Sequence, residues 1–198
     1  MTLECEVKFL DVDLDVLRNR LVEKGATGAP ALFETNVVFD RSDRSLKKAG
    51  VLLRLRNYGG KALLTVKRPP EHEPVSSLKV FDEIESGVDD FEAVRQALLV
   101  AGLREAFSYE KVRECWKFMD CTVCLDRLPF GDFVEVEGNK RPVFRCAEAL
   151  GLDEFPSSNK TYHALNLEHR RSKDLYPEEG FVFSPEQKEA IFAEIGED

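Results

Sequence analysis

The sequence contains no long apolar run and no excess of basic residues. No stretch approaches the roughly 20 apolar residues that a helix needs to cross a bilayer, so we expect no membrane-spanning segment. Its 28 Lys and Arg residues are outnumbered by 37 Asp and Glu residues, which gives a net charge of −9. Nucleic acids and anionic membranes select basic surfaces, so we expect neither as a partner. Any anion-binding site must therefore be local.

Cysteine and histidine are also sparse and show no metal-binding spacing. The five cysteines are an odd number without regular spacing, and the chain shows no signal-peptide pattern. We therefore expect reduced thiols and a cytoplasmic protein. Cys121 and Cys124 form a C-x-x-C pair, but alternation along a strand would point them to opposite faces. The three histidines show no ligand pairing either, so a metal would have to be bound by oxygen ligands.

Charged residues, in contrast, alternate with apolar ones along nearly every strand-like segment. Glu4, Glu6 and Lys8 alternate with apolar neighbours in the first of these segments. Because residues i and i+2 share a face of a strand, each such strand has one ionic and one apolar face. The same parity holds for Arg54, Arg56, Lys67, Glu83, Glu85, Lys111, Arg113, Asp126, Glu135 and Glu137.

The pattern predicts strands separated by helices. We expect strands at about 3–10, 34–40, 51–58, 61–69, 79–86, 107–115, 115–128 and 131–138. Helical spacing and capping residues predict helices within 11–26, 88–103, 142–152, 158–170 and 184–198. Residues 41–50 are expected to form a charged turn, and the proline-rich residues 69–77 a flexible loop. If the strands enclose a tunnel, this loop would lie at its entrance.

These strands can be arranged in two ways. Each charged row can be a solvated sheet face with salt bridges between strands, which is the simpler explanation for any single strand. If the ionic faces instead turn inward, the strands form a tunnel with cations and carboxylates, suited to a metal and a polyphosphate. Helices would then cover the apolar outer faces. The second arrangement gains support as the number of alternating strands increases.

The ordered set of motifs resembles the CYTH superfamily, also called the triphosphate tunnel metalloenzymes. Its most specific part is the Glu-x-Glu-x-Lys pattern of Glu4, Glu6 and Lys8, and the resemblance runs from Leu3 to about Leu165. The motifs that follow are VLLRLR, LTVKRP, DEIE, EKVRE, CLDRLPFGDFVEVEG and NKTYHAL. The resemblance implies an α+β fold in which an eight-stranded antiparallel barrel with a charged interior is flanked by amphipathic helices. We expect one domain over residues 1–198, with the barrel at about 1–165 and a helical tail at about 166–198.

The resemblance also implies a site within that barrel. The implied catalytic residues are Glu4, Glu6, Glu83 and Glu85. The implied triphosphate-binding residues are Lys8, Arg54, Arg56, Lys67, Lys111, Arg113 and Lys160. The implied metal ligands are Glu4, Glu6, Glu135, Glu137 and Asp126, with Mg²⁺ or Mn²⁺ as the cofactor. The chain departs from the family at Phe81, where family members commonly have arginine. Lys79 on the same face is a candidate substitute, and the Phe81 ring a candidate for stacking on an organic group.

The function implied is a divalent-metal-dependent phosphohydrolase that cleaves a small triphosphate. The candidate substrates are inorganic tripolyphosphate, thiamine triphosphate and a nucleoside triphosphate. One alternative is a class IV adenylyl cyclase that converts ATP to cyclic AMP and pyrophosphate. A second is a non-catalytic binder of polyphosphate or organic anions, and a third is a purely structural protein. Nothing in the sequence specifies an oligomeric state.

Overall fold

The computed structural model describes residues 2–70 and 79–196, with the side chains of residues 2–4, 79–80 and 140 outside that description. The predicted loop at 69–77 therefore lies almost entirely outside the described residues. Within the described part of the chain, eight long strands and two short ones form one antiparallel sheet. The long strands are β1 (Thr2–Leu10), β3 (Leu32–Asp40), β4 (Leu52–Tyr58), β5 (Lys61–Arg68), β6 (Lys79–Val88), β7 (Arg104–Phe118), β8 (Cys121–Leu128) and β9 (Gly131–Gly138). The short strands are β2 (Thr27–Gly28) and β10 (Ser157–Ser158).

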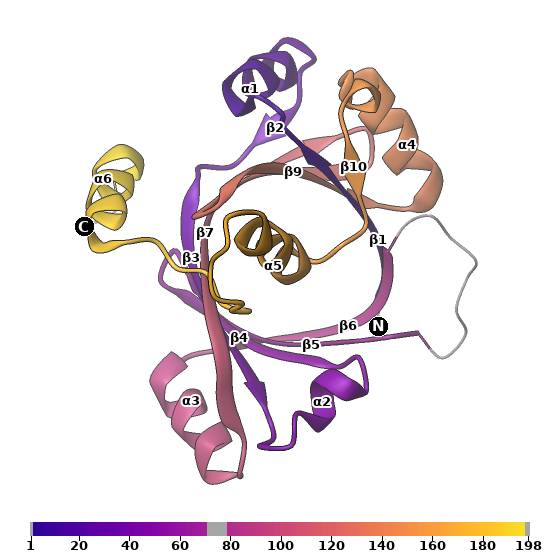
Figure 1. Ribbon diagram of the computed structural model, residues 1–198. Coiled ribbons are helices and arrows are strands. Elements are labelled where there is room, and N and C mark those ends of the chain that lie inside the picture. The colour runs from indigo at the N-terminus through magenta and orange to yellow at the C-terminus, as the bar shows by residue number, and fades with distance from the viewer. Residues whose placement is uncertain (1, 71–78, 197–198) are drawn as a thin grey trace.

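The eight long strands form a closed ring, as the barrel prediction requires. Their order is β1, β6, β5, β4, β3, β7, β8 and β9. Residues 2–6 of β1 pair with β6, and residues 5–10 of β1 pair with β9, so the first strand closes the ring (Figure 1). Closure leaves none of these strands as an unpaired edge, and the polar faces turn toward the interior.

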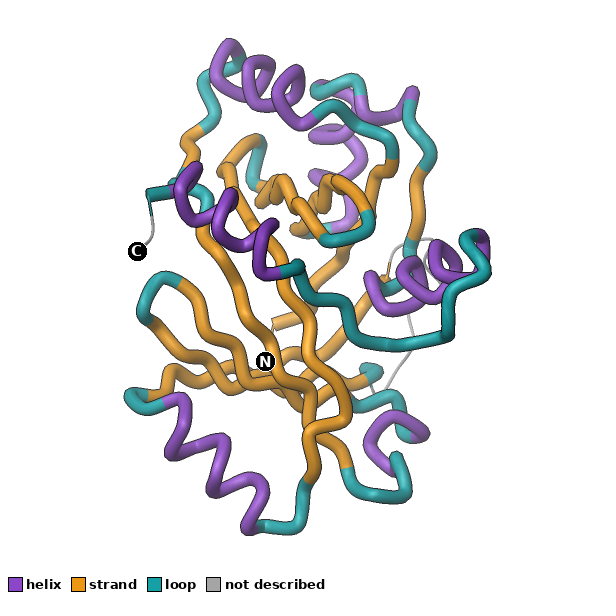
Figure 2. Tube along the Cα trace, turned by 60° about the vertical axis from the view of Figure 1, so that its left-hand side comes forward, coloured by secondary structure: helices purple, strands orange, loops and turns teal. Residues whose placement is uncertain are grey.

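Helices surround the strands, as Figure 2 shows. They are α1 (Leu14–Glu23), α2 (Ser45–Lys48), α3 (Phe91–Val100), α4 (Lys140–Ala149), α5 (Tyr162–Ser172) and α6 (Pro185–Ile195), with a 3₁₀ turn at Leu152–Glu154. Asp13 caps α1, and Ser184 forms a capping box with Gln187 at the start of α6. The segment 41–50, predicted as a charged turn, contains the short helix α2. Helix α5 begins at Tyr162, four residues after the start of the predicted helical segment.

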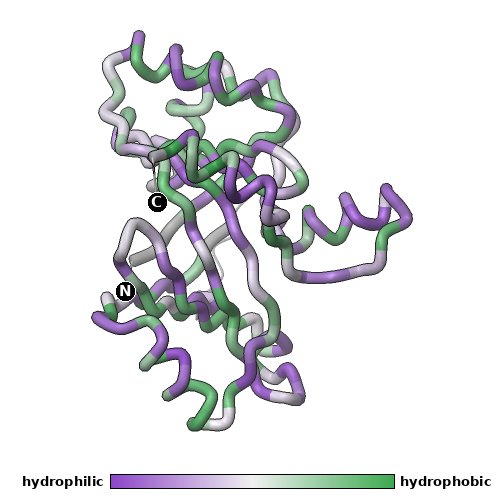
Figure 3. The backbone as a smooth tube through the Cα atoms, turned by 90° about the vertical axis from the view of Figure 1, so that its left-hand side faces the viewer, coloured by the Kyte–Doolittle hydropathy of each residue, from purple (hydrophilic) through white to green (hydrophobic). Residues whose placement is uncertain are grey.

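The apolar outer faces of the strands pack under these helices. Helices α1 and α4 cover β1, β8 and β9, and α3 covers β3 and β4. Helix α6 places Ile191 and Phe192 against Phe33 and Val112 on β3 and β7. Figure 3 shows hydrophilic and hydrophobic residues alternating along strands and helices. Among the described residues, none of the helices combines the length and apolarity that crossing a membrane requires.

The predicted boundary between the sixth and seventh strands is wrong. Instead of ending at Cys115, β7 continues to Phe118, and the chain turns at Met119 and Asp120, which both have positive φ. A two-residue turn in which both residues have positive φ has a backbone twist that matches the right-handed twist of the flanking strands. The turn contains no glycine, which is why the usual sequence signal for a hairpin is missing here.

The expectation that all cysteines are reduced is also corrected. Cys115 on β7 and Cys124 on β8 are directly opposite one another in the sheet and form a disulfide. The other three cysteines of the described chain, Cys5, Cys121 and Cys146, are free and buried. Cys121 packs in the outer core while Cys124 shares the inner face with Asp126, so the two residues of the C-x-x-C pair do lie on opposite faces.

Candidate active site in the barrel tunnel

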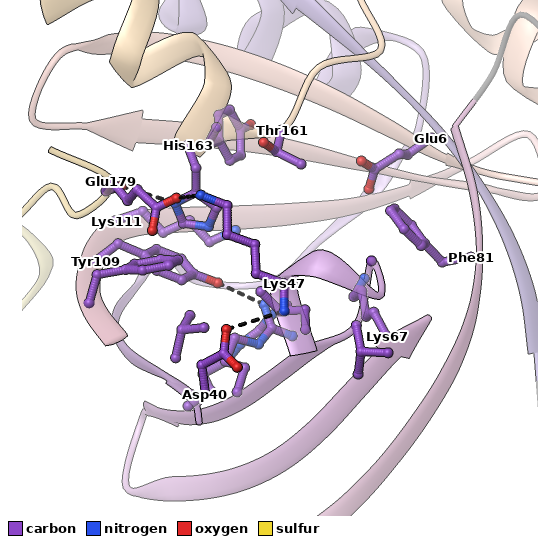
Figure 4. Close-up of a pocket in the computed structure, with 18 of the residues that line it drawn as sticks. Glu6, Asp40, Lys47, Lys67, Phe81, Tyr109, Lys111, Thr161, His163 and Glu179 are labelled. Carbon is purple, nitrogen blue, oxygen red and sulfur yellow. Dashed lines mark hydrogen bonds and ion pairs between the residues drawn. The ribbon is translucent and has the colours of Figure 1, made fainter. Parts of the chain in front are cut away.

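The barrel encloses a cavity of about 300 Å³. The inner faces of β1, β4, β5, β7 and β9 contribute charged side chains to its wall, and α5 lies across one opening (Figures 1 and 4). Of the predicted site residues, those that line the cavity are Glu6, Lys8, Arg54, Arg56, Lys67, Lys111, Arg113, Glu135 and Glu137. The alternation therefore brings cations and carboxylates from distant parts of the chain into one enclosed space.

Three carboxylates gather on the wall formed by β1 and β9. Glu6 is opposite Glu137 in the strand register, and Glu135 is one position of the same face further along. One oxygen from each of the three lies within 4.8 Å of the others. Carboxylate oxygens are the ligands that hard divalent cations such as Mg²⁺ and Mn²⁺ prefer, so the donor set fits such an ion. The side chain of Glu4, predicted as a fourth ligand, lies outside the described residues.

Two cations hold these carboxylates in place. The Lys8 ammonium lies 2.8 Å from Glu6 and 2.6 Å from Glu135, and it is almost fully buried. Burial opposes its charge, but Glu135 and Glu6 together raise the pKa of Lys8 above its ordinary value. Arg113 contacts Glu135 and lies 3.5 Å from Glu137. Burial likewise opposes the charge of Glu135, and Lys8 and Arg113 hold its pKa well below the ordinary range.

Asp126 occupies a different position from the other predicted metal ligands. Its two carboxylate oxygens accept hydrogen bonds from Arg113 at 2.6 and 2.5 Å, and the Tyr162 hydroxyl donates to it at 2.7 Å. The side chain is fully buried, with Lys111 at 3.5 Å. Asp126 is not among the three carboxylates that converge. In this arrangement it orients Arg113 and joins α5 to the barrel.

A second group of buried charges lies on β3, β4 and β7. Arg56 reaches Asn36 at 3.2 Å and Glu34 at 3.4 Å, and Lys111 lies 3.6 Å from Glu34. Burial would raise the pKa of Glu34, but Lys111 and Arg56 overcome it and lower that pKa to about 2. Arg54 donates to the Tyr109 hydroxyl at 3.0 Å. The cations that the resemblance assigns to phosphate are thus held by acids and hydroxyls of neighbouring strands.

Two buried donors in this group have no hydrogen-bond partner among the described residues. They are Nε of Arg54 and Nδ2 of Asn36. A buried donor without an acceptor is costly, and such groups in a cavity are suited to an anionic ligand. Phosphate oxygens are acceptors, and arginine matches their geometry well. Of the two residues, Arg54 lines the cavity, so its guanidinium fits a phosphorylated ligand bound against β4.

On the wall formed by β5 and β6, one carboxylate forms an ion pair and another accepts a hydrogen bond from a hydroxyl. Lys67 lies 2.8 Å from Glu83, and the Thr65 hydroxyl donates to Glu85 at 2.8 Å. The carboxylate of Glu85 is the more exposed of the two acids. Phe81 lines the cavity beside Glu6 in Figure 4, whereas the side chain of Lys79 lies outside the described residues.

The predicted site residue Lys160 lies apart from the tunnel. Its ammonium is 2.6 Å from Glu168, and both side chains are about half exposed. Lys160 precedes α5 on the solvent side, whereas Tyr162 two residues later points inward and hydrogen-bonds Asp126. The sequence motif located this segment, but the direction of its side chains depends on how α5 packs.

The structure adds site residues that the sequence analysis did not name. Glu34, Asn36 and Tyr109 lie inside the barrel, and Tyr162 reaches it from α5. The signal for the first two was present but interrupted, because Glu34, Asn36 and Asp40 share one parity while Thr35 and Val38 break the alternation. Tyr109 shares the parity of Lys111 and Arg113. Tyr162 carries no such signal, since it belongs to a helix.

Fold and site together define a β-barrel protein with an ionic tunnel, whose cations suit an anion, and a carboxylate cluster suited to a divalent cation. The CYTH domain model matches residues 2–142. The chain therefore belongs to the CYTH family, whose members are triphosphatases or adenylyl cyclases and generally depend on a divalent metal.

Individual relatives agree with this assignment. The chain is 28% identical over 136 residues to a Methanocaldococcus jannaschii protein named "Putative adenylate cyclase", covering 68% of this chain and 76% of that one. The fold matches a Vibrio parahaemolyticus structure of the same description with a TM-score of 0.70, 18% identity and coverage of 83% and 98%. It also matches a Hippeastrum protein described as a putative adenylyl cyclase with a dominant triphosphatase activity, with a TM-score of 0.61, 17% identity and coverage of 89% and 98%.

Proposed function

We propose that the protein is a metal-dependent hydrolase that cleaves a small triphosphate inside the barrel. The observation that supports this is that a carboxylate cluster and a set of cations line the same cavity. The convergent carboxylates Glu6, Glu135 and Glu137 lie directly beside a set of buried cations. Enclosing both signs costs several kcal/mol of desolvation per ion, so a binding function explains their retention better than stability does.

In this proposal the chain's own residues bind and align the substrate. The phosphate oxygens are held by Lys8, Arg54, Arg56, Lys67, Lys111 and Arg113. Glu6, Glu135 and Glu137, with Glu4, hold Mg²⁺ or Mn²⁺, which when bound neutralises charge on the phosphates. Glu83 and Glu85, on β6 beside β1 and within 4.0 Å of Arg54, orient the attacking water. The substrate is a small-molecule triphosphate, and most of the catalysis is positioning and electrostatic stabilisation.

Adenylyl cyclase is the second candidate function. It is favoured by the name of the M. jannaschii relative, which is 28% identical to this chain. In that reaction the ribose 3′ oxygen of ATP attacks the α-phosphorus, the bond to pyrophosphate breaks, and the hydroxyl proton passes to a base. The same cations would hold the triphosphate in either reaction. A non-catalytic anion binder with Phe81 against an organic group is the third candidate.

A product assay separates the three candidates. The purified chain is incubated with Mg²⁺ or Mn²⁺ and tripolyphosphate, thiamine triphosphate or ATP, and the products are resolved by chromatography. We expect orthophosphate and the corresponding diphosphate. Cyclic AMP as the main product would replace the first proposal with the second. Calorimetric binding without turnover at any metal concentration would favour the third.

Glu135→Gln tests the carboxylate cluster. The amide keeps the size of the side chain but removes a negative charge from the position between Lys8 and Arg113. We expect kcat/KM to fall by at least about 10- to 100-fold, since even indirect supports of a metal site cost that much, and the metal concentration for half-maximal activity to rise. Glu189→Gln on the exposed side of α6 is the matched control. Equal activity of the two variants would contradict the assignment.

A further inference from the structure

One end of the tunnel reaches solvent beside α2, and its charges are arranged differently from those deeper inside. We call Asp40, Arg44, Lys47 and Glu179 the mouth cluster, and all four line the cavity (Figure 4 labels three of them). The Lys47 side chain is 60% exposed, which places it at the border with water. Two acids and two bases make the cluster neutral overall.

Glu179 is the centre of this cluster. Its carboxylate forms ion pairs with both Arg44 and Lys47 of the α2 segment. Arg44 also lies 3.7 Å from Asp40, whose carboxylate accepts hydrogen bonds from the backbone of α2. Both mouth cations are therefore already paired with carboxylates of the chain itself.

The backbone around Glu179 is fixed from both sides. The buried side chain of Asn166 on α5 donates to the carbonyls of Glu178 at 2.8 Å and Gly180 at 3.1 Å. The amide of Phe181 donates to Ser108 on β7 at 3.2 Å. Residues 166 and 178–181 lie beyond residue 142, where the match to the CYTH model ends, whereas Ser108 lies within it. A segment outside the matched domain thus places a carboxylate at the entrance of the barrel.

Apolar side chains line the same cavity as the cluster. They are Val38, Val51, Leu52 and Phe107, and the Arg44 guanidinium lies over the Phe107 ring at 5.8 Å from its centroid. Phe107 packs edge-on against His163, with ring centroids 4.6 Å apart. A phosphate that extended into this region would be repelled by the Glu179 carboxylate and would have to compete with it for Arg44 and Lys47. An uncharged organic group would leave these ion pairs in place.

We infer that Glu179 is a specificity-determining residue that limits the number of phosphates the tunnel accepts. This inference rests on the proposed triphosphate-cleaving function. The physical reason is repulsion between like charges placed together at an interface, which discriminates against the wrong ligand. The site then favours a triphosphate whose end at the mouth carries an uncharged organic group, over a longer inorganic polyphosphate.

The test compares the full-length protein with Glu179→Gln on inorganic tripolyphosphate and tetrapolyphosphate. The measured quantity is the ratio of kcat/KM for the two substrates, together with the ratio of their dissociation constants from calorimetry. We expect Glu179→Gln to shift both ratios toward tetrapolyphosphate by about tenfold. Adding Lys47→Gln to that variant should reverse much of the shift, because it removes a cation that the first substitution had released.

Glu178→Gln is the matched control. Glu178 is the adjacent carboxylate, but it pairs with Arg170 at 3.3 Å and does not line the tunnel, so its ratios should equal those of the wild type. If Glu179 only anchors the C-terminal segment, Glu179→Gln will lower the thermal midpoint and leave both ratios unchanged, and that result would overturn the inference. Absence of turnover in the wild type would refute the proposed function, while the ratio of dissociation constants would still test Glu179.

Discussion

At the scale of single residues, the interior of this barrel is a set of mutually supported charges. Lys8 and Asp126 are almost inaccessible to solvent, and each contacts at least two charged partners. Such pairs seldom add stability relative to apolar residues of the same size, yet removing one partner leaves a buried charge uncompensated. The tunnel residues are therefore sensitive positions for stability as well as for binding.

Glu34 gives a pH-dependent prediction at this scale. Its pKa is about 2 in the folded protein and 4.5 without the fold, so its contribution to stability is complete above pH 4.5. That contribution is lost as the pH falls from 4.5 toward 2, because the unfolded chain takes up the proton first. At about 1.4 kcal/mol per pKa unit, the loss is on the order of 3 kcal/mol.

Urea unfolding at a series of pH values measures this contribution. We expect the free energy of unfolding to fall less steeply below pH 4.5 in Glu34→Gln than in the wild type, and the variant to be less stable at pH 7. Glu189→Gln, on the exposed side of α6, should follow the wild-type curve. Parallel curves for Glu34→Gln and the wild type would show that Lys111 and Arg56 do not stabilise the Glu34 carboxylate.

At the scale of elements, each helix has a defined structural task on the barrel. Because the polar faces of the strands turn inward, the apolar faces are outside and must be covered. Helices α1, α3, α4 and α6 provide that cover. Helix α5 differs, since Tyr162 enters the tunnel and Asn166 holds the segment that carries Glu179. The helices after residue 142 thus both complete the outer core and shape the entrance.

The start of α6 gives a prediction at this scale. The Ser184 hydroxyl accepts a hydrogen bond from the backbone N–H of Gln187 in a capping box. Helix α6 in turn covers Phe33 and Val112. Ser184→Ala should lower the free energy of unfolding by about 1 kcal/mol, the usual cost of losing such a cap. Ser42→Ala, an exposed serine outside any cap, is the control. Equal thermal midpoints for the two variants would mean that α6 does not contribute to the cooperative fold.

At the scale of the whole molecule, the tunnel couples ligand binding to closure of the barrel. The carboxylate cluster joins β1 to β9, which is the pairing that closes the ring. The cations that face it come from β4, β5 and β7. A metal with a triphosphate would therefore bridge strands that are far apart in the sequence, and it would bind only the closed fold.

This coupling predicts thermal stabilisation by the ligand. At concentrations 100 times the dissociation constant, ligand binding adds about 2.7 kcal/mol to the free energy of unfolding. For a chain of this length that corresponds to a rise of roughly 5–10 °C in the thermal midpoint. Scanning fluorimetry should show the full rise with tripolyphosphate plus Mg²⁺ or Mn²⁺ and a smaller one after chelation. An equal rise in Glu135→Gln would place the metal elsewhere.

Much of the fold could be predicted from the sequence because strand periodicity is a local property. Alternation along β1, β4, β5, β6 and β9 indicated both the strands and which face is ionic. The same rule applied to β3 would have included Glu34. The end of β7 could not be placed in this way, because the turn at Met119 and Asp120 carries no glycine or proline.

By itself the sequence determined the alternation of charge and apolar residues, the helix caps and the motifs of the family, since each depends on neighbours a few positions away. Only the tertiary structure decided which charges meet. Asp126 accepts hydrogen bonds from Arg113 and Tyr162, Lys160 lies outside the tunnel, and Glu179 lies at the tunnel entrance. These contacts join residues up to 135 positions apart in the sequence. They depend on closure of the ring and on the packing of α5, which no local pattern specifies.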